Sequence, residues 1–166
     1  FIINNPQTKQ PIPQMNPDAC GAAWFVKEIK MVANADSEMT ALSDFNPLQT
    51  AIADKRFESH FDNFNLQYDS TATIKLNSIV CNHLVYESNS STEQFAVFSE
   101  IFYDKGWNAY VDGKLMPHIR VNYVLRGMRV PAGKHTIEFK FEPSVYRNGE
   151  RIALISSSIL LIKFIG

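Results

Sequence analysis

Short apolar segments separated by turn sequences occupy most of this chain, and they restrict it to a β-sheet fold. The clearest segment is residues 135–142, where Ile137, Phe139 and Phe141 alternate with charged or polar side chains. Asp112-Gly113 stands between two further apolar runs, and this dipeptide favours a tight hairpin turn. Antiparallel hairpins with one apolar face need a second layer to cover that face. The pattern therefore predicts two packed antiparallel sheets.

Other segments have the aromatic and β-branched content of strands, and their ranges are 24–32, 71–80, 84–87, 95–103 and 107–111, the last pairing with residues from 114 onward. A period of two places one set of apolar residues on a common face: Ala72, Ile74, Leu76 and Val80. A polar turn is expected at 88–91, and a short helix is expected between a cap at Asp36 or Ser37 and a stop at Pro47. The predicted fold class is mainly β, an antiparallel β-sandwich of jelly-roll or immunoglobulin-like type with one or two short helices and an apolar C-terminal segment.

The chain is expected to have three parts. Residues 1–20 contain four prolines and predict an extended linker without regular structure, and residues 21–148 form the β-sandwich domain. Residues 152–162 are apolar on every helical face apart from three serines, which is typical of a membrane span. This run is shorter than the roughly 20 residues that cross a bilayer. Residues 149–166 are therefore either the truncated start of a membrane span or a terminal packing segment.

Composition excludes several classes of partner. Sixteen basic and 17 acidic residues give a net charge of -1, so the chain lacks the positive field on which nucleic-acid binding depends. Cys20 and Cys81 are the two cysteines, and neither lies at zinc-ligand spacing from other ligands, so no metal site and no cofactor is expected. The two cysteines form a disulfide if the domain is exported and oxidised, or else remain as two buried free thiols.

Catalytic motifs are missing from the sequence, and no catalytic residue is expected. There is no G-x-S-x-G, no cysteine close to a histidine and no H-E-x-x-H. Glu100, Asp104 and Asp112 are available for two-carboxylate sugar hydrolysis, although an aspartate in a turn commonly bonds its own backbone. A secreted glycoside hydrolase therefore stays an alternative, and it requires two carboxylates lining one deep cleft.

Aromatic and arginine side chains are densest between residues 100 and 126. Aromatic faces stack on sugar rings, and planar arginine donors bind hydroxyls, carboxylates or phosphates. This chemistry predicts a glycan-binding set, which is Trp107, Tyr110, Arg120, Tyr123 and Arg126. The same residue types also cover the edge of a small sandwich core and pair with nearby glutamates, which is the structural alternative.

Two sequence pieces with defined spacing carry a resemblance to a known family. They are G-W-x-x-x-x-D-G at 106–113 and P-A-G-K-H at 131–135, within the longer stretches 97–114, 120–127 and 130–137. These stretches resemble the C-terminal region of YfhO-like bacterial membrane proteins, and residues 20–26 are similar to the version found in Bacteroidetes.

The resemblance implies a larger, multi-span parent protein related to the glycosyltransferases that use lipid-linked sugars. The chain is then an extracytoplasmic domain on the periplasmic side of the inner membrane, and the transferase chemistry belongs to the membrane-embedded part. The implied partners are that membrane-embedded part and a glycan or lipid-linked sugar, with no nucleic acid. The function expected is a non-catalytic accessory domain, and the alternative is a structural or protein-interaction module without a ligand.

Overall fold

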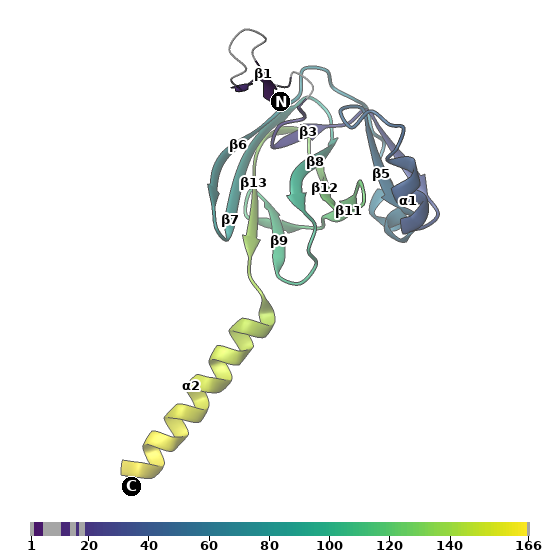
Figure 1. Cartoon of the computed structure of the whole chain (residues 1–166). Coiled ribbons are helices and arrows are strands. Elements are labelled where there is room, and N and C mark those ends of the chain that lie inside the picture. Colours follow the sequence, from purple (N-terminus) through teal and green to yellow (C-terminus); the bar gives the residue numbers. More distant parts are fainter. Residues whose placement is uncertain (1, 5–10, 14–15, 17–18, 166) are drawn as a thin grey trace.

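The computed structural model describes residues 2–4, 11–13, 16 and 19–165, and its centre is a sandwich of two antiparallel sheets (Figure 1). In spatial order, the five-stranded sheet contains β10 (Lys114–Met116), β9 (Trp107–Val111), β13 (Gly133–Phe141), β7 (His83–Ser90) and β6 (Thr73–Val80). The four-stranded sheet contains β11 (Ile119–Val121), β12 (Leu125–Val130), β8 (Gln94–Ile101) and β3 (Ala23–Phe25). The predicted antiparallel β-sandwich is confirmed.

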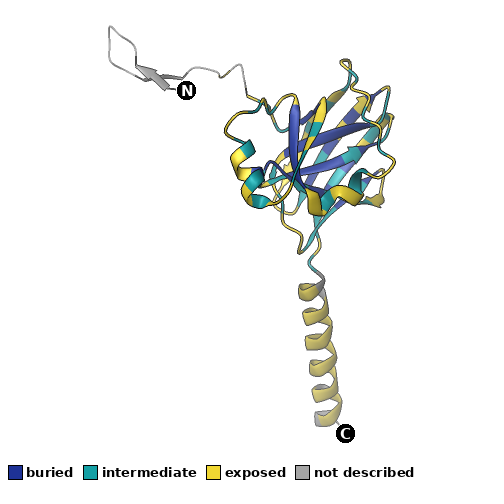
Figure 2. Ribbon diagram, turned by 90° about the vertical axis from the view of Figure 1, so that its right-hand side faces the viewer, coloured by how far each residue is buried: buried dark blue, intermediate teal, exposed yellow. Residues whose placement is uncertain are grey.

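An aromatic core joins the two sheets. Tyr86, Phe98 and Phe139 are each fully buried, and they come from β7, β8 and β13. The ring of Phe98 meets the rings of Tyr86 and Phe139 edge-on, with 4.9 Å between centroids in both pairs. Buried residues gather between the sheets in Figure 2, as the alternating pattern of each strand requires.

The four-stranded sheet is also covered on its outer side, by a small layer that the sequence pattern only partly indicated. This layer contains β4 (Glu28–Val32), α1 (Ala35–Ala41), β5 (Thr50–Asp54) and the 3-10 helix η1 (Lys55–Phe61), with β4 and β5 paired in parallel. A second apolar cluster fills this space and includes Trp24, Val26, Ala51, Ala53, Phe95, Val97, Ile119 and Val121. Since β8 is covered on both sides, its residues from Gln94 to Phe98 are all buried.

Three local expectations need correction. The expected strand 24–32 is two strands, because the chain turns at Val26-Lys27 and β3 and β4 belong to different sheets. The expected turn at 88–91 lies mostly within β7, where Ser88 and Ser90 continue the inward face and are buried. A register shift between Leu76 and Ser78 interrupts the alternation of β6, so Val80 is exposed.

The expected short helix is present as α1, but its cap is different. The side chain of Asn34, and not that of Asp36 or Ser37, accepts a hydrogen bond at the helix start, from the backbone N of Ser37. Asparagine is among the best N-cap residues because its side-chain oxygen satisfies a backbone donor of the first turn. The helix ends at Ala41, well before Pro47.

The two ends of the chain differ in structure. Within the expected linker, β1 (Ile2–Asn4) and β2 (Pro11–Pro13) form a two-stranded antiparallel pair, so this part is not free of regular structure, and most of the remaining linker residues lie outside those described. At the other end, the 22-residue helix α2 (Ser144–Ile165) leaves β13 and runs away from the sandwich (Figure 1). Its described side chains are exposed (Figure 2). In the part of the chain that the structure describes, no helix is both long and apolar enough to cross a membrane.

Replacing Gly127 with alanine is expected to lower the free energy of unfolding by about 1–3 kcal/mol, because the new methyl group overpacks the covered sheet. A Cβ atom at this position would lie 2.7 Å from Cζ of Phe95 and 3.0 Å from Cγ1 of Val121. Urea denaturation measures the change, and Gly149→Ala in α2 is the control, since its added methyl group would meet nothing within 4 Å beyond its chain neighbours and the backbone of its own helix. Equal stability of the two variants would contradict the prediction.

Candidate functional site

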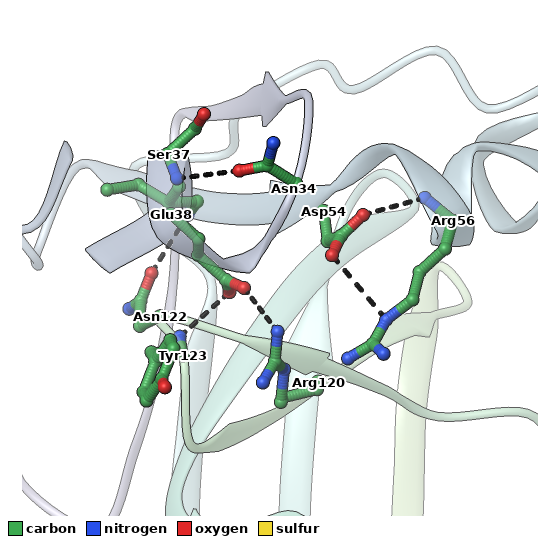
Figure 3. A network of polar contacts seen from close by, with 9 residues as sticks. Asn34, Ser37, Glu38, Asp54, Arg56, Arg120, Asn122 and Tyr123 are labelled. Carbon is green, nitrogen blue, oxygen red and sulfur yellow. Dashed lines mark hydrogen bonds and ion pairs between the residues drawn. The ribbon is translucent and has the colours of Figure 1, made fainter. Parts of the chain in front are cut away.

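Arg120 and Tyr123, two of the predicted glycan contacts, belong to a buried polar network around Glu38 (Figure 3). Glu38 comes from α1 and is fully buried. Its Oε2 accepts a hydrogen bond from Nη2 of Arg120 at 2.6 Å, and its Oε1 accepts one from the backbone N of Tyr123 at 2.8 Å. The guanidinium carbon of Arg120 lies 5.1 Å from the ring centroid of Tyr123. These contacts fix α1 to the β11–β12 turn.

Asn122 extends the same network to β5. Its side-chain Oδ1 accepts a hydrogen bond from the backbone N of Ile52, and its own backbone N donates to the carbonyl O of Ile52, both at 2.8 Å. The turn places Asn122 at φ 48 and Tyr123 at φ 68, in the left-handed region. Sequence reasoning missed Glu38, because a glutamate in a short helix gives no signal of burial. The network engages the side chain of Arg120 and the backbone N of Tyr123.

Trp107 and Arg126 are brought together between the sheets. Arg126 is only 2% exposed, and its guanidinium carbon lies 4.3 Å from the ring centroid of Trp107 and 5.0 Å from that of Phe139. Its Nε donates to the carbonyl O of Ile101 at 3.0 Å. Burial lowers the pKa of Arg126, and the nearby Glu100 opposes that change. Burial, with a further contribution from Glu100, raises the pKa of Tyr86 to about 12. Trp107 and Arg126 therefore cover one end of the core.

Tyr110 lies apart from the other predicted contacts, on the outer face of the five-stranded sheet. Its hydroxyl donates to Oε2 of Glu142 at 2.7 Å, and the side-chain amide of Asn108 donates to the same oxygen at 2.9 Å. Nζ of Lys140 lies 5.2 Å from the ring centroid of Tyr110. The five predicted residues therefore occupy three separate places, and the structure does not join them into one ligand site.

A cleft of about 500 Å³ lies elsewhere, where the edge strands β3 and β6 of the two sheets approach each other. We call it the edge cleft. It is lined by residues of both strands and by Lys27, Leu48, Gln49 and Tyr68 from neighbouring segments, and Lys75 of β6 is among the lining residues. Tyr68 and Leu48 are each 42% exposed, and Nζ of Lys27 lies 5.3 Å from the ring centroid of Tyr68. The cleft thus combines an accessible aromatic ring with the ammonium group of Lys27, and a second lysine, Lys75, also lines it.

Asp69 is the carboxylate of the edge cleft, and its oxygens are already engaged. Oδ1 accepts from the backbone N of Thr71 at 2.8 Å and from its hydroxyl at 2.6 Å. Oδ2 accepts from the backbone N of Ser91 at 2.7 Å and from its hydroxyl at 2.6 Å. The side-chain and backbone bonds from Ser91 and Thr71 hold the pKa of Asp69 well below its usual range. Asp69 therefore connects two loops through hydrogen bonds, and its negative charge is held in a fixed position.

A second cleft, of about 410 Å³, lies beside Trp107 and is lined also by Phe102, Asp104, Leu115, Met116 and His118. Each of the two clefts is lined by one carboxylate, Asp69 in the first and Asp104 in the second. Two-carboxylate hydrolysis needs a pair of these groups facing the same sugar. Neither cleft supplies such a pair.

The cysteines and possible metal ligands add no further site. Cys20 and Cys81 are both free, with Cys20 partly buried beside the second apolar cluster and Cys81 exposed between β6 and β7. The disulfide alternative is therefore not realised, and only one of the two thiols is shielded. Among the described residues, no group of three or more His, Cys, Asp or Glu side chains is placed to hold a metal ion.

Comparisons with known proteins give one match. The model of a family described as bacterial membrane protein YfhO matches residues 55–153, which is more than half of the chain. No curated protein and no solved structure matches the chain. The matched range runs from η1 to the middle of α2 and covers most strands of the sandwich. The chain therefore belongs to the YfhO family of bacterial membrane proteins.

Proposed function

We propose that this chain is a non-catalytic, extracytoplasmic accessory domain of a polytopic, glycosyltransferase-like membrane protein, and that it positions a glycan or lipid-linked acceptor. The observation that carries the proposal is the edge cleft between β3 and β6. Its lining includes an exposed aromatic ring, an amide side chain and two lysines, which are groups that bind sugars. The transferase chemistry then belongs to the membrane-embedded part of the parent protein.

The edge cleft favours an acidic glycan. The exposed ring of Tyr68 offers a face for the C–H groups of a sugar, and Gln49 offers an amide for its hydroxyls. Lys27 and Lys75 add two positive charges against the single charge of Asp69. A uronic acid or a phosphate on the glycan would complement that balance, with each ammonium acting as a compact point charge.

This assignment replaces the ligand contacts expected from the sequence. Arg120 and Arg126 are committed to the fold through Glu38, Trp107 and a backbone carbonyl. Freeing either arginine for a ligand would leave a buried charge without its partner, which costs free energy. The edge-cleft side chains are exposed and can bind without such a loss.

Binding of sugars to the 166-residue chain tests the proposal. We expect a panel of disaccharides to show preference for members that carry a uronate or phosphate over neutral members of the same size, measured by titration calorimetry. Tyr68→Ala and the double variant Lys27→Ala/Lys75→Ala should each weaken binding about tenfold, in line with the loss of one stacked ring or two charge-assisted contacts.

The matched control is Lys114→Ala, which removes an exposed lysine at the β9–β10 turn, outside the edge cleft. Its affinity should equal that of the unmodified chain. Unchanged affinity in the Tyr68 and lysine variants would reject the cleft. No binding of any sugar by the folded chain would favour the alternative function, a structural or protein-interaction module.

The location of the domain has a separate test in the native host. An antibody against this chain should detect a membrane protein much larger than 18.9 kDa. Added protease should cut the domain once the outer layer of the cell is opened, while the inner membrane stays sealed. A soluble antigen of about the size of this chain, or cleavage only after the inner membrane is broken, would contradict the extracytoplasmic assignment.

A further inference from the structure

One end of the sandwich is defined by the place where α2 begins. Phe141, the last residue of β13, pairs with Trp107 and donates its backbone N–H to the carbonyl O of Asn82 at 2.9 Å. The next residue, Glu142, donates its backbone N–H to the carbonyl O of Gly106 at 2.6 Å. The β6–β7 turn, the β8–β9 connection and the start of α2 therefore lie together at this end, as Figure 1 also shows.

Exposed apolar side chains gather at the same end, from three separate connections. We call this set the apolar rim, and its members are Ile79 (63% exposed), Val80 (58%), Ile101 (70%), Tyr103 (50%) and Val124 (45%). Their common location follows from pairing: Val80 faces His83, which faces Lys140 near the end of β13, and Ile101 faces Leu125. Phe102, between Ile101 and Tyr103, donates its backbone N–H to the carbonyl O of Val124 at 2.7 Å.

The helix that leaves this end contains an apolar stretch in its C-terminal half. From Ile152 to Ile162 the residues are apolar except for three serines, and the described side chains are exposed. The hydroxyls of Ser156, Ser157 and Ser158 donate to the carbonyl oxygens of the residues four positions earlier, each at 2.8 Å. Their donors are therefore satisfied within the helix, as apolar surroundings require. At 1.5 Å per residue this stretch is about 16 Å long, roughly half of a hydrocarbon core.

We infer that the apolar rim is a bilayer-contacting face, which rests on the lipid surface while the apolar part of α2 enters the adjoining leaflet. A protein groove would select one apolar stripe on the helix, whereas lipid accepts an apolar surface on every side. Rim residues from three connections lie at the end of the sandwich from which the helix leaves. The first eight residues of α2, about 12 Å along its axis, would cross the polar headgroup layer between the rim and Ile152. Tyrosine is typical of this interfacial depth, and isoleucine and valine add apolar area that can be buried there.

This inference concerns a surface at the α2 end, whereas the edge cleft of the proposed function is lined by the opposite end of β6. The two are therefore separable: vesicle binding can fail while sugar binding persists, and the reverse. The rim also sets an orientation, with the β9–β10 turn directed away from the lipid. That turn lies at the far end of β9 from Trp107.

Cys81 provides a probe within the rim, because it is exposed and directly follows Val80. In a Cys20→Ser variant of the full 166-residue chain, Cys81 is labelled with an environment-sensitive dye. The emission maximum of this dye should move to shorter wavelength when phosphatidylcholine vesicles are added. The matched control carries the dye at Lys114→Cys, with both native cysteines changed to serine. Lys114 is exposed and begins β10, at the far end of β9 from Trp107, so its dye should keep the emission seen in water.

Rim variants test whether the face itself contributes to binding. Ile101→Asp/Tyr103→Asp should lower the vesicle partition coefficient at least tenfold, whereas Lys114→Asp, at the opposite end of β9, should change it less than twofold. Neutral vesicles are used so that repulsion between aspartate and anionic lipid plays no part. Circular dichroism confirms that each variant is folded, and Val80→Asp replaces the double variant if that one is not.

Three outcomes would overturn the inference. In the first, the dye on Cys81 keeps its emission in water while the chain binds vesicles, which would mean that α2 binds the lipid and the rim does not touch it. In the second, the folded rim variants partition as well as the unmodified chain. In the third, the unmodified chain does not bind vesicles and forms a dimer that the rim variants abolish, which would assign the face to a second copy of the chain.

Discussion

Replacing Glu38 with alanine is expected to lower the free energy of unfolding by about 3–5 kcal/mol, the loss typical of breaking a buried ion pair from one side. Glu38 is fully buried and accepts bonds from Arg120 and from the backbone of Tyr123. Without the carboxylate, the guanidinium of Arg120, whose side chain is 16% exposed, keeps its charge and loses its counter-ion. Thermal unfolding followed by circular dichroism should show the midpoint falling by about 10 °C.

Two further variants separate the buried charge from the loss of side-chain contacts. Arg56→Ala removes the partner of Asp54, but the side chain of Arg56 is 55% exposed and its Nε lies 3.7 Å from the carboxylate, so we expect a change below about 1 kcal/mol. Glu38→Leu combined with Arg120→Met removes both charges and should recover most of the lost stability. If the double variant is no more stable than Glu38→Ala, the loss of stability comes from the missing hydrogen bonds of Glu38 and not from the unpaired charge of Arg120.

Acidification from pH 6.5 to pH 4 is expected to remove about 3 kcal/mol of stability through His118 alone. Burial, and then the charge of the nearby Arg126, lower the pKa of His118 to about 4. Its ring packs edge-on against Phe102 and Phe139, with centroids 5.4 and 5.6 Å apart, where an imidazolium would be poorly solvated.

The sign follows from proton counts. Between pH 6.5 and 4 the unfolded chain binds a proton at His118 and the folded chain does not, so the unfolded state gains stability as the pH falls. Burial and the charge of Arg129 also lower the pKa of His60, which adds to the same trend. Urea denaturation at a series of pH values measures the slope. His118→Phe should flatten the profile, and an unchanged profile would contradict the assignment.

The strands were predictable wherever one face of the strand is buried and the other is exposed to solvent. Residues 135–141 and the hairpin around Asp112-Gly113 follow this rule, and they form β13 and the β9–β10 pair. The Asp112-Gly113 turn has positive φ at both residues, 50 and 78, as the dipeptide indicates. β5 was missed because Thr50–Asp54 is buried on both faces and shows no alternation.

The candidate site was less predictable, because a sequence lists side chains without their partners. Trp107 and Arg126 do contact each other, but the contact lies inside the fold. An aromatic ring stacked on an arginine uses the same residue types in a core as in a sugar site, so the sequence does not distinguish the two. The edge cleft joins Lys27 and Tyr68 to Lys75, which come from three separate segments and belong to no motif. Their meeting depends on how the open edges of two sheets approach each other, and no short-range pattern encodes that distance.

The position of β13 in its sheet has a mechanical consequence. β13 lies between β7 and β9, with eight residue pairs on one side and five on the other, and it continues into α2 through a short connection. A tensile load along α2 therefore acts in shear on two hydrogen-bonded ladders at once, and cannot peel them apart one bond at a time as it would at a sheet edge. The strand that continues into α2 is thus held on both sides against being pulled out of its sheet.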